Sequence, residues 1–158
     1  MAFDRAKEYL DKMGFGDRVR EFDVSSATVE LAAVAVGTEP ERIAKSLTFM
    51  VGEKPVMILC AGDAKINNSK YKQFFHTKAK MLTRDEVCRL IGHDVGGVCP
   101  FGINDGVDVY LDESLKRFDI VYPACGSSSS AVKLTIPELE ETSQFLEWID
   151  VCKLPEEE

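Results

Sequence analysis

The chain has 158 residues, 45% of them hydrophobic, and a formal net charge of −8 at neutral pH. This length suits one domain with a proper core, so we expect residues 1–158 to form a single domain. No apolar run approaches the length of a membrane span, and the charged start is unlike a signal peptide, so we expect no contact with a membrane.

Helical spacing of apolar residues, with cap and stop residues around it, predicts helices along the whole chain. They are expected over 2–13, over 27–37 with Ser25 or Ser26 as the cap, from 38–41 to near Lys45, from 67–69 through Phe75, over 83–91, and from Pro137 through Ile149. Glycines 14, 37 and 92 are expected to end three of these helices.

Alternating or continuous apolar runs predict the strands. They are expected over 18–24, 46–51, 55–61, 79–82, 107–111, 118–122 and 131–136, with 46–51 and 55–61 as a hairpin. Helices and strands are interspersed without a βαβ repeat. The fold class is therefore predicted as mixed α+β with a largely antiparallel, curled sheet.

Cysteine and histidine usage limits the chemistry. The five cysteines are an odd number without a Cys-x-x-Cys pair, which argues against a disulfide framework and for a reducing compartment, the cytoplasm. Two histidines are too few for a typical zinc site, so we expect no metal and no cofactor. Cys99 and Cys125 lie in glycine-rich loops, but a catalytic thiolate needs an activating base, and structural roles are favoured for both.

Charge is strongly segregated. The segment 64–84 carries +6 with no acidic residue, which leaves the rest of the chain at −14. Such a segment is either a solvated surface or a contact for a polyanion such as RNA. Its candidate RNA-binding residues are Lys65, Lys70, Lys72, Lys78 and Lys80.

The most informative feature is one lysine together with two distant glycine-rich loops. Lys45 is expected between a helix and a strand, where its ammonium either reaches the surface or projects into a cleft. The loops span 96–102 and 125–130. Each is either a plain connection or a wall of main-chain N–H groups that can bind an anion or polarise an ester carbonyl.

These motifs together resemble the YbaK-type aminoacyl-tRNA deacylase family, which includes the editing domain of bacterial prolyl-tRNA synthetases. The resemblance rests on Ile43–Phe49, on Gly-Gly-Val-Cys-Pro-Phe-Gly at 96–102 and on Tyr-Pro-Ala-Cys-Gly at 122–126, in the family's order, and covers about 15–147. It implies a curled, barrel-like mixed sheet surrounded by helices. It also implies hydrolysis of the ester that joins a wrong amino acid to the 3′ end of a transfer RNA. The serines of the 125–130 loop suggest that this amino acid is small or polar.

The resemblance also implies the site. Lys45 and Gly97 correspond to catalytic positions, with the lysine holding a phosphate or ribose hydroxyl and the loop amides stabilising the oxyanion. The expected substrate contacts are Ser46, Gly96, Val98, Cys99, Pro100, Gly102, Gly126, Ser127 and Ser128. The implied partners are a mischarged tRNA and an aminoacyl-tRNA synthetase.

One departure keeps a rival function open. Ala131 stands where relatives that remove cysteine from proline tRNA have an aspartate, and the histidine of the alanine-editing relatives is missing too. The alternative is therefore a module that binds aminoacyl-tRNA or a small metabolite without hydrolysing it. A third hypothesis, a Cys99-dependent enzyme, predicts inactivation by thiol alkylation.

Overall fold

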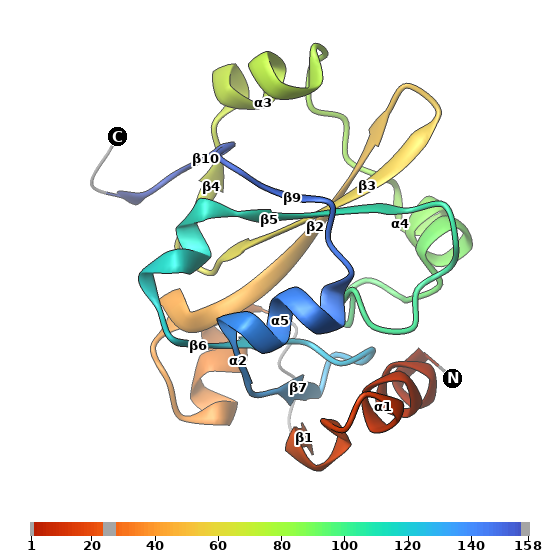
Figure 1. Cartoon of the computed structure of the whole chain (residues 1–158), viewed down its shortest axis with the longest axis vertical. Coiled ribbons are helices and arrows are strands. Elements are labelled where there is room, and N and C mark those ends of the chain that lie inside the picture. Colours follow the sequence, from red (N-terminus) through yellow and green to blue (C-terminus); the bar gives the residue numbers. More distant parts are fainter. Residues whose placement is uncertain (1, 24–27, 156–158) are drawn as a thin grey trace.

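The computed structural model describes residues 2–23 and 28–155 and contains a curled six-stranded sheet with helices around it. The strand order is β8-β6-β2-β3-β5-β9. In Figure 1 the long strands β2 and β3 cross the middle of the molecule, with helix α3 at one end and helix α1 at the other. The predicted α+β class with a curled mixed sheet is confirmed.

The helical elements vary from single turns to eleven residues. They are α1 (Ala2–Lys12), η1 (Gly16–Arg18), α2 (Val29–Val36), η2 (Pro40–Arg42), α3 (Asn68–Phe75), α4 (Arg84–Glu86), η3 (Val87–Ile91), η4 (Glu113–Arg117) and α5 (Ile136–Ser143). None of these described helices is long and apolar enough to span a membrane.

The strands of the main sheet are β2 (Ile43–Val51), β3 (Lys54–Ala61), β5 (Asp108–Asp112), β6 (Ile120–Pro123), β8 (Leu134–Thr135) and β9 (Glu147–Ile149). Two small pairs lie outside it: β1 (Val19–Glu21) with β7 (Ser130–Val132), and β4 (Lys65–Ile66) with β10 (Cys152–Lys153).

The β2–β3 hairpin is confirmed, but the sheet is not largely antiparallel. Strand β2 is parallel to β6, and β5 is parallel to both β3 and β9. Only the pairs β2–β3 and β6–β8 are antiparallel in this sheet. The parallel pairs join segments far apart in the sequence, which local patterns cannot reveal.

The predicted helix from 38–41 to Lys45 is wrong. A single turn, η2, is followed at once by β2, so Lys45 lies inside a strand. Ile43 and Ala44 pair there with β6, and Ala44 also pairs with the end of β3. Pairing on both sides of the strand therefore overrides the helix signal at Pro40.

Several element boundaries also differ from the predictions. Thr28 caps α2, while Ser25, Ser26 and Val24 lie outside the described residues. The segment 79–82 forms only one isolated bridge, between Met81 and Phe49. The predicted strand 131–136 is divided between β7 and β8.

The last helix is shorter than predicted. Helix α5 ends at Ser143, and Gln144 adopts a left-handed φ of 51°. The following residues Glu147–Ile149 form β9 against β5. Their apolar spacing therefore serves an edge strand, and a window of about five residues cannot separate this from one more helical turn.

The core lies between the sheet and its helices. Phe49 on β2, Met57 and Leu59 on β3 and Leu111 on β5 are all almost fully buried, together with Tyr71 from α3. A second, smaller cluster joins α2 to β2. This second cluster holds α2 beside the strand that carries Lys45 and Ser46.

Candidate functional site

A cavity of about 330 Å³ lies along β2. It is lined by the start of α2, by β2, by residues around Met81 and Val87, by the loop Val95–Val98 and by residues near β6 and β7. Lys45 and Tyr122 are its only ionisable lining residues within the described chain. The cavity therefore offers little side-chain acid–base chemistry, in agreement with the sequence-based hypothesis.

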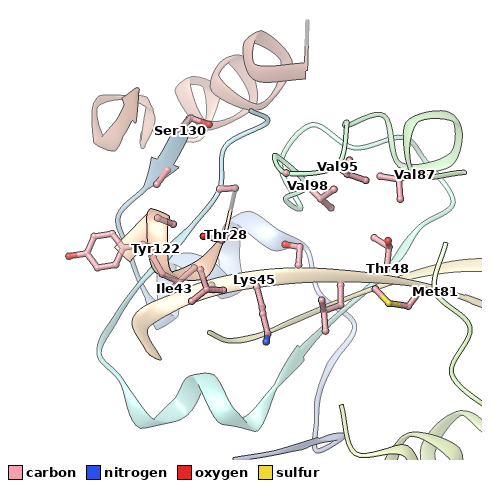
Figure 2. Close-up of a pocket in the computed structure, with 18 of the residues that line it drawn as sticks. Thr28, Ile43, Lys45, Thr48, Met81, Val87, Val95, Val98, Tyr122 and Ser130 are labelled. Carbon is pink, nitrogen blue, oxygen red and sulfur yellow. The ribbon is translucent and has the colours of Figure 1, made fainter. Parts of the chain in front are cut away.

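Strand alternation decides which β2 side chains face this cavity. Figure 2 shows Thr48 on the side of Val95 and Val98, and Lys45 on the opposite side of the strand. Ser46 shares the face of Thr48 because side chains two apart in a strand point the same way. The Ser46 hydroxyl is buried and has no hydrogen-bond partner among the described residues.

The two glycine-rich loops meet, as the motif hypothesis requires. The amide of Gly126 donates to the carbonyl of Gly97 at 3.0 Å. A Cβ on Gly97 would lie 2.4 Å from the amide nitrogen of Ser127 and 2.5 Å from the carbonyl carbon of Gly126. Only glycine allows this approach, so Gly97 joins the loops.

The amide of Gly97, one of the expected oxyanion donors, is already used inside the protein. The Gly97 amide already donates to the Asp94 carbonyl at 3.2 Å, which corrects its predicted role as a donor to substrate. Gly96 and Val98 both line the cavity. Within the described chain neither of their amides donates a main-chain hydrogen bond.

The Lys45 ammonium does not face the glycine loop, contrary to the sequence-based hypothesis. It donates to the carbonyl of Ala64 at 2.5 Å and to that of Gly62 at 3.4 Å, on the turn that follows β3. That turn is held on both sides. A Cβ on Gly62 would lie 2.0 Å from the Pro40 carbonyl, and Asp63 forms an ion pair with Arg117.

Three further residues of the 96–102 loop lie outside the cavity. Cys99 is fully buried, and Pro100 and Gly102 line a separate polar hollow beside Tyr9. The structure therefore does not bring these three predicted substrate contacts to the site.

The Cys99 thiol has a neighbouring histidine but no usable base. Cys99 Sγ lies 3.5 Å from His93 Nε2, and the same nitrogen lies 2.8 Å from the Phe101 carbonyl. This nitrogen therefore carries the proton and donates to the carbonyl, so it cannot accept one from the thiol. Burial raises the pKa of Cys99 and lowers the pKa of His93, which keeps both groups neutral.

The second loop contributes different residues from those predicted. Gly126, Ser127 and Ser128 are not among the described residues that line the cavity, whereas Ser130 and Ala131 are. The Ser127 hydroxyl donates to that of Ser130 at 2.9 Å, so Ser127 contacts a lining residue without lining the cavity itself. The sequence signal that could have found them is the strand predicted over 131–136, whose observed counterpart β7 begins at Ser130.

The basic segment is divided between tied and exposed lysines. Lys70 donates to the Asp150 carboxylate and to the Cys152 carbonyl, both at 3.0 Å, and so anchors the C-terminal strand. Lys65 lies on β4 opposite Lys153. Lys72 and Lys78 line a cleft of about 390 Å³ with Asn68, Ser69 and Ala79, and Lys80 is exposed next to Met81.

No described part of the chain gathers three metal-ligating side chains of the His, Cys, Asp or Glu type. The five cysteines are free thiols, and four of them are buried. Around the cavity, the described residues thus include a buried hydroxyl without a partner, at Ser46, and two loop amides without a main-chain partner, at Gly96 and Val98.

Comparison with known proteins identifies the class. Residues 24–142 match the aminoacyl-tRNA editing domain family, and the chain belongs to that family. It is 55% identical over 154 residues to the uncharacterized protein YwhH of Bacillus subtilis, covering 97% of this chain and 98% of that protein. It is 30% identical over 102 residues to the proline–tRNA ligase of Geobacillus sp., covering 64% of this chain but only 18% of the ligase.

Solved structures give the same assignment. A crystal structure described as a candidate trans-editing enzyme for prolyl-tRNA synthetase has a TM-score of 0.87 at 30% identity, covering 96% of this chain and 97% of that one. The hypothetical protein APE2540 shares the fold, with a TM-score of 0.82 at 22% identity, covering 94% of this chain and 99% of that protein. The resemblance read from the sequence motifs is confirmed.

Proposed function

We propose that residues 1–158 act as one cytoplasmic editing domain, which works in trans and hydrolyses the ester of a tRNA mischarged with a small amino acid. Family membership supports the tRNA substrate. The observation that carries the hydrolytic step is the pairing of two uncommitted amides, at Gly96 and Val98, with the unpartnered Ser46 hydroxyl around one cavity of the described chain.

In this mechanism the loop amides receive the charge that develops on the ester oxygen. Amides fixed by the loop are already oriented toward the developing negative charge, which lowers the barrier without reorganisation. Gly97 keeps the amides in place by holding the two loops together. Water is the nucleophile, because the cavity contains no thiol and no carboxylate among its described lining residues.

Ser46 is proposed to bind the amino group or carbonyl of the attached amino acid. A buried hydroxyl without a partner costs free energy in the empty protein, and a polar ligand group would remove that cost. The apolar wall of Ile43, Val87, Val98 and Ala131 favours a small, uncharged amino acid, because the Lys45 ammonium is bound to main-chain carbonyls on the other side of β2.

Lys45 is proposed to support the shape of the site and not to contact the substrate. Its ammonium fixes the turn after β3, residues 61–64, against β2. Strand β2 carries Thr48 on its other face (Figure 2), and Ser46 shares that face by strand alternation. Lys45 is thus a positioning residue for the cavity wall.

A deacylation screen tests the proposal. The protein is incubated with proline, alanine and threonine tRNAs, each carrying a small non-cognate amino acid, and the remaining ester is measured over time. We expect at least one ester to be hydrolysed faster than in buffer. Protection of the esters would instead establish the rival function, a binding module.

Two matched serine variants test the site itself. Ser46→Ala removes the unpartnered cavity hydroxyl, so we expect unchanged or slightly higher stability and a clear loss of deacylation. Ser143→Ala is the control, because its hydroxyl is also buried without a partner among the described residues but lies outside this cavity. Equal activity in both variants would remove Ser46 from the mechanism.

A further inference from the structure

The cavity and the lysine cleft are connected by one short segment, 78–82. Ala79 lines the cleft, and Met81 lines the cavity. Their Cα atoms are at most about 7 Å apart, because Met81 follows Ala79 by only two positions along the chain. Lys80 lies between them and is exposed.

This connecting segment is held firmly on the sheet. The Met50 amide donates to the Lys80 carbonyl at 2.8 Å, and the Leu82 amide donates to the Thr48 carbonyl at 3.1 Å. Main-chain bonds on both sides of Met81 fix the backbone and leave the Lys80 and Met81 side chains outside the pairing. The segment therefore presents them at a fixed distance from the cavity.

Positive charge near segment 78–82 is available to a ligand, whereas the rest of the chain is acidic. Lys72, Lys78 and Lys80 are exposed, and no ion pair is formed by any of them within the described chain. The rest of the protein outside 64–84 carries −14, which repels RNA from other faces. A polyanion is thus attracted to this edge.

Resting on the proposed function, we infer that segment 78–82 is the path of the RNA strand: the 3′ end enters the cavity past Met81, and the phosphates upstream of it lie on Lys80 and in the cleft of Lys72 and Lys78. The exposed thioether of Met81, 58% accessible, offers an apolar surface to a terminal base. Because Ala79 and Met81 are this close, a strand end that enters the cavity past Met81 has its preceding phosphates near Lys80 and the cleft.

The other two predicted RNA-binding lysines, Lys65 and Lys70, do not lie on this path. Lys70 is already bound to Asp150 and to the Cys152 carbonyl. Lys65 lines neither the cleft nor the cavity. The path therefore assigns Lys72, Lys78 and Lys80 to RNA.

Binding of a labelled RNA hairpin with an unpaired 3′ end tests the path without requiring hydrolysis. Fluorescence anisotropy is measured across a salt series for the native chain, for Lys72→Ala/Lys78→Ala, and for a control, Lys12→Ala/Lys133→Ala, which removes two exposed lysines elsewhere. All side chains changed are exposed, and the thermal unfolding midpoint checks that each fold is intact.

We expect the cleft variant to lower the slope of log K against log salt by about two, because each of the two lysines would no longer neutralise a phosphate. This corresponds to a Kd about 40-fold weaker at 0.15 M salt if the binding lines converge at 1 M. Lys80→Ala should lower the slope by about one, and the control should match the native chain.

Two results would overturn the path: an unchanged slope in the cleft variant, or an equal loss in the control. Neither depends on hydrolysis. If the native chain hydrolyses an ester while the cleft variant binds RNA normally, the path fails and the deacylase proposal stands. If no ester is hydrolysed but the cleft variant loses RNA binding, the path stands and the binding module replaces the deacylase.

Discussion

Replacing Lys45 by methionine separates a positioning role from direct substrate contact. Methionine keeps most of the apolar stem and removes the ammonium, so the carbonyls of Ala64 and Gly62 lose their shared donor. If Lys45 acts by fixing the 61–64 turn, this variant loses stability and activity together.

The size of the stability loss follows from the two hydrogen bonds. A hydrogen bond to a charged group contributes about 1.5–3 kcal/mol. The 2.5 Å bond to Ala64 counts in full, whereas the 3.4 Å bond to Gly62 is near the limit of a hydrogen bond and adds little. A loss of about 2 kcal/mol lowers the melting temperature of a chain of this size by roughly 4–8 °C.

The assay is thermal unfolding by circular dichroism, with deacylation measured on the same preparations. Lys45→Arg, which still donates to both carbonyls, should recover much of the stability and part of the activity. Lys133→Met is the control, since this exposed lysine lies outside the turn. Abolished deacylation at a native melting temperature would refute positioning and show that Lys45 contacts the substrate.

Three further predictions concern the loops. Gly97→Ala forces a methyl group against the backbone of Ser127 and Gly126, so we expect urea unfolding to show destabilisation by about 1–3 kcal/mol, together with loss of deacylation. Native stability in this variant would contradict the steric argument. Burial lowers the pKa of His93, so the unfolded chain binds its proton first and stability should fall as the pH drops below about 6.5. Urea titrations from about pH 5 to 8 should show that the free energy of unfolding depends less on pH in His93→Gln than in the native chain. An unchanged pH dependence would mean that other groups cause it. Thiol alkylation at neutral pH should modify exposed Cys88 and spare Cys99 and Cys125, because both are shielded from the reagent and burial raises the pKa of each, that of Cys125 to about 12. Inactivation that follows modification of Cys99 would restore the thiol hypothesis.

Much of the fold was accessible from local sequence patterns. The helix predicted from 67–69, the helix start predicted at Thr83 and the β2–β3 hairpin all appear, because each depends on residues a few positions apart. The motif order also indicated the family, and the family model confirms it.

The cavity required the tertiary structure. Strand alternation gave the faces of β2, but only the pairing of β2 with both β3 and β6 turned the segment around Lys45 from a helix into a strand. That change directs the ammonium to Gly62 and Ala64 and leaves Ser46 facing the cavity.

The sequence by itself determined which residues could serve the site: glycines that permit close backbone approach, a lysine, and a basic segment in an acidic chain. Tertiary structure decided which of them lie around the cavity. The Gly97 amide is used within its own loop, Ser130 and Ala131 take the place of Ser127 and Ser128, and Lys70 is tied to Asp150. The physical reason is that hydrogen-bonding capacity is a property of each residue, whereas its satisfaction depends on neighbours brought close only by folding.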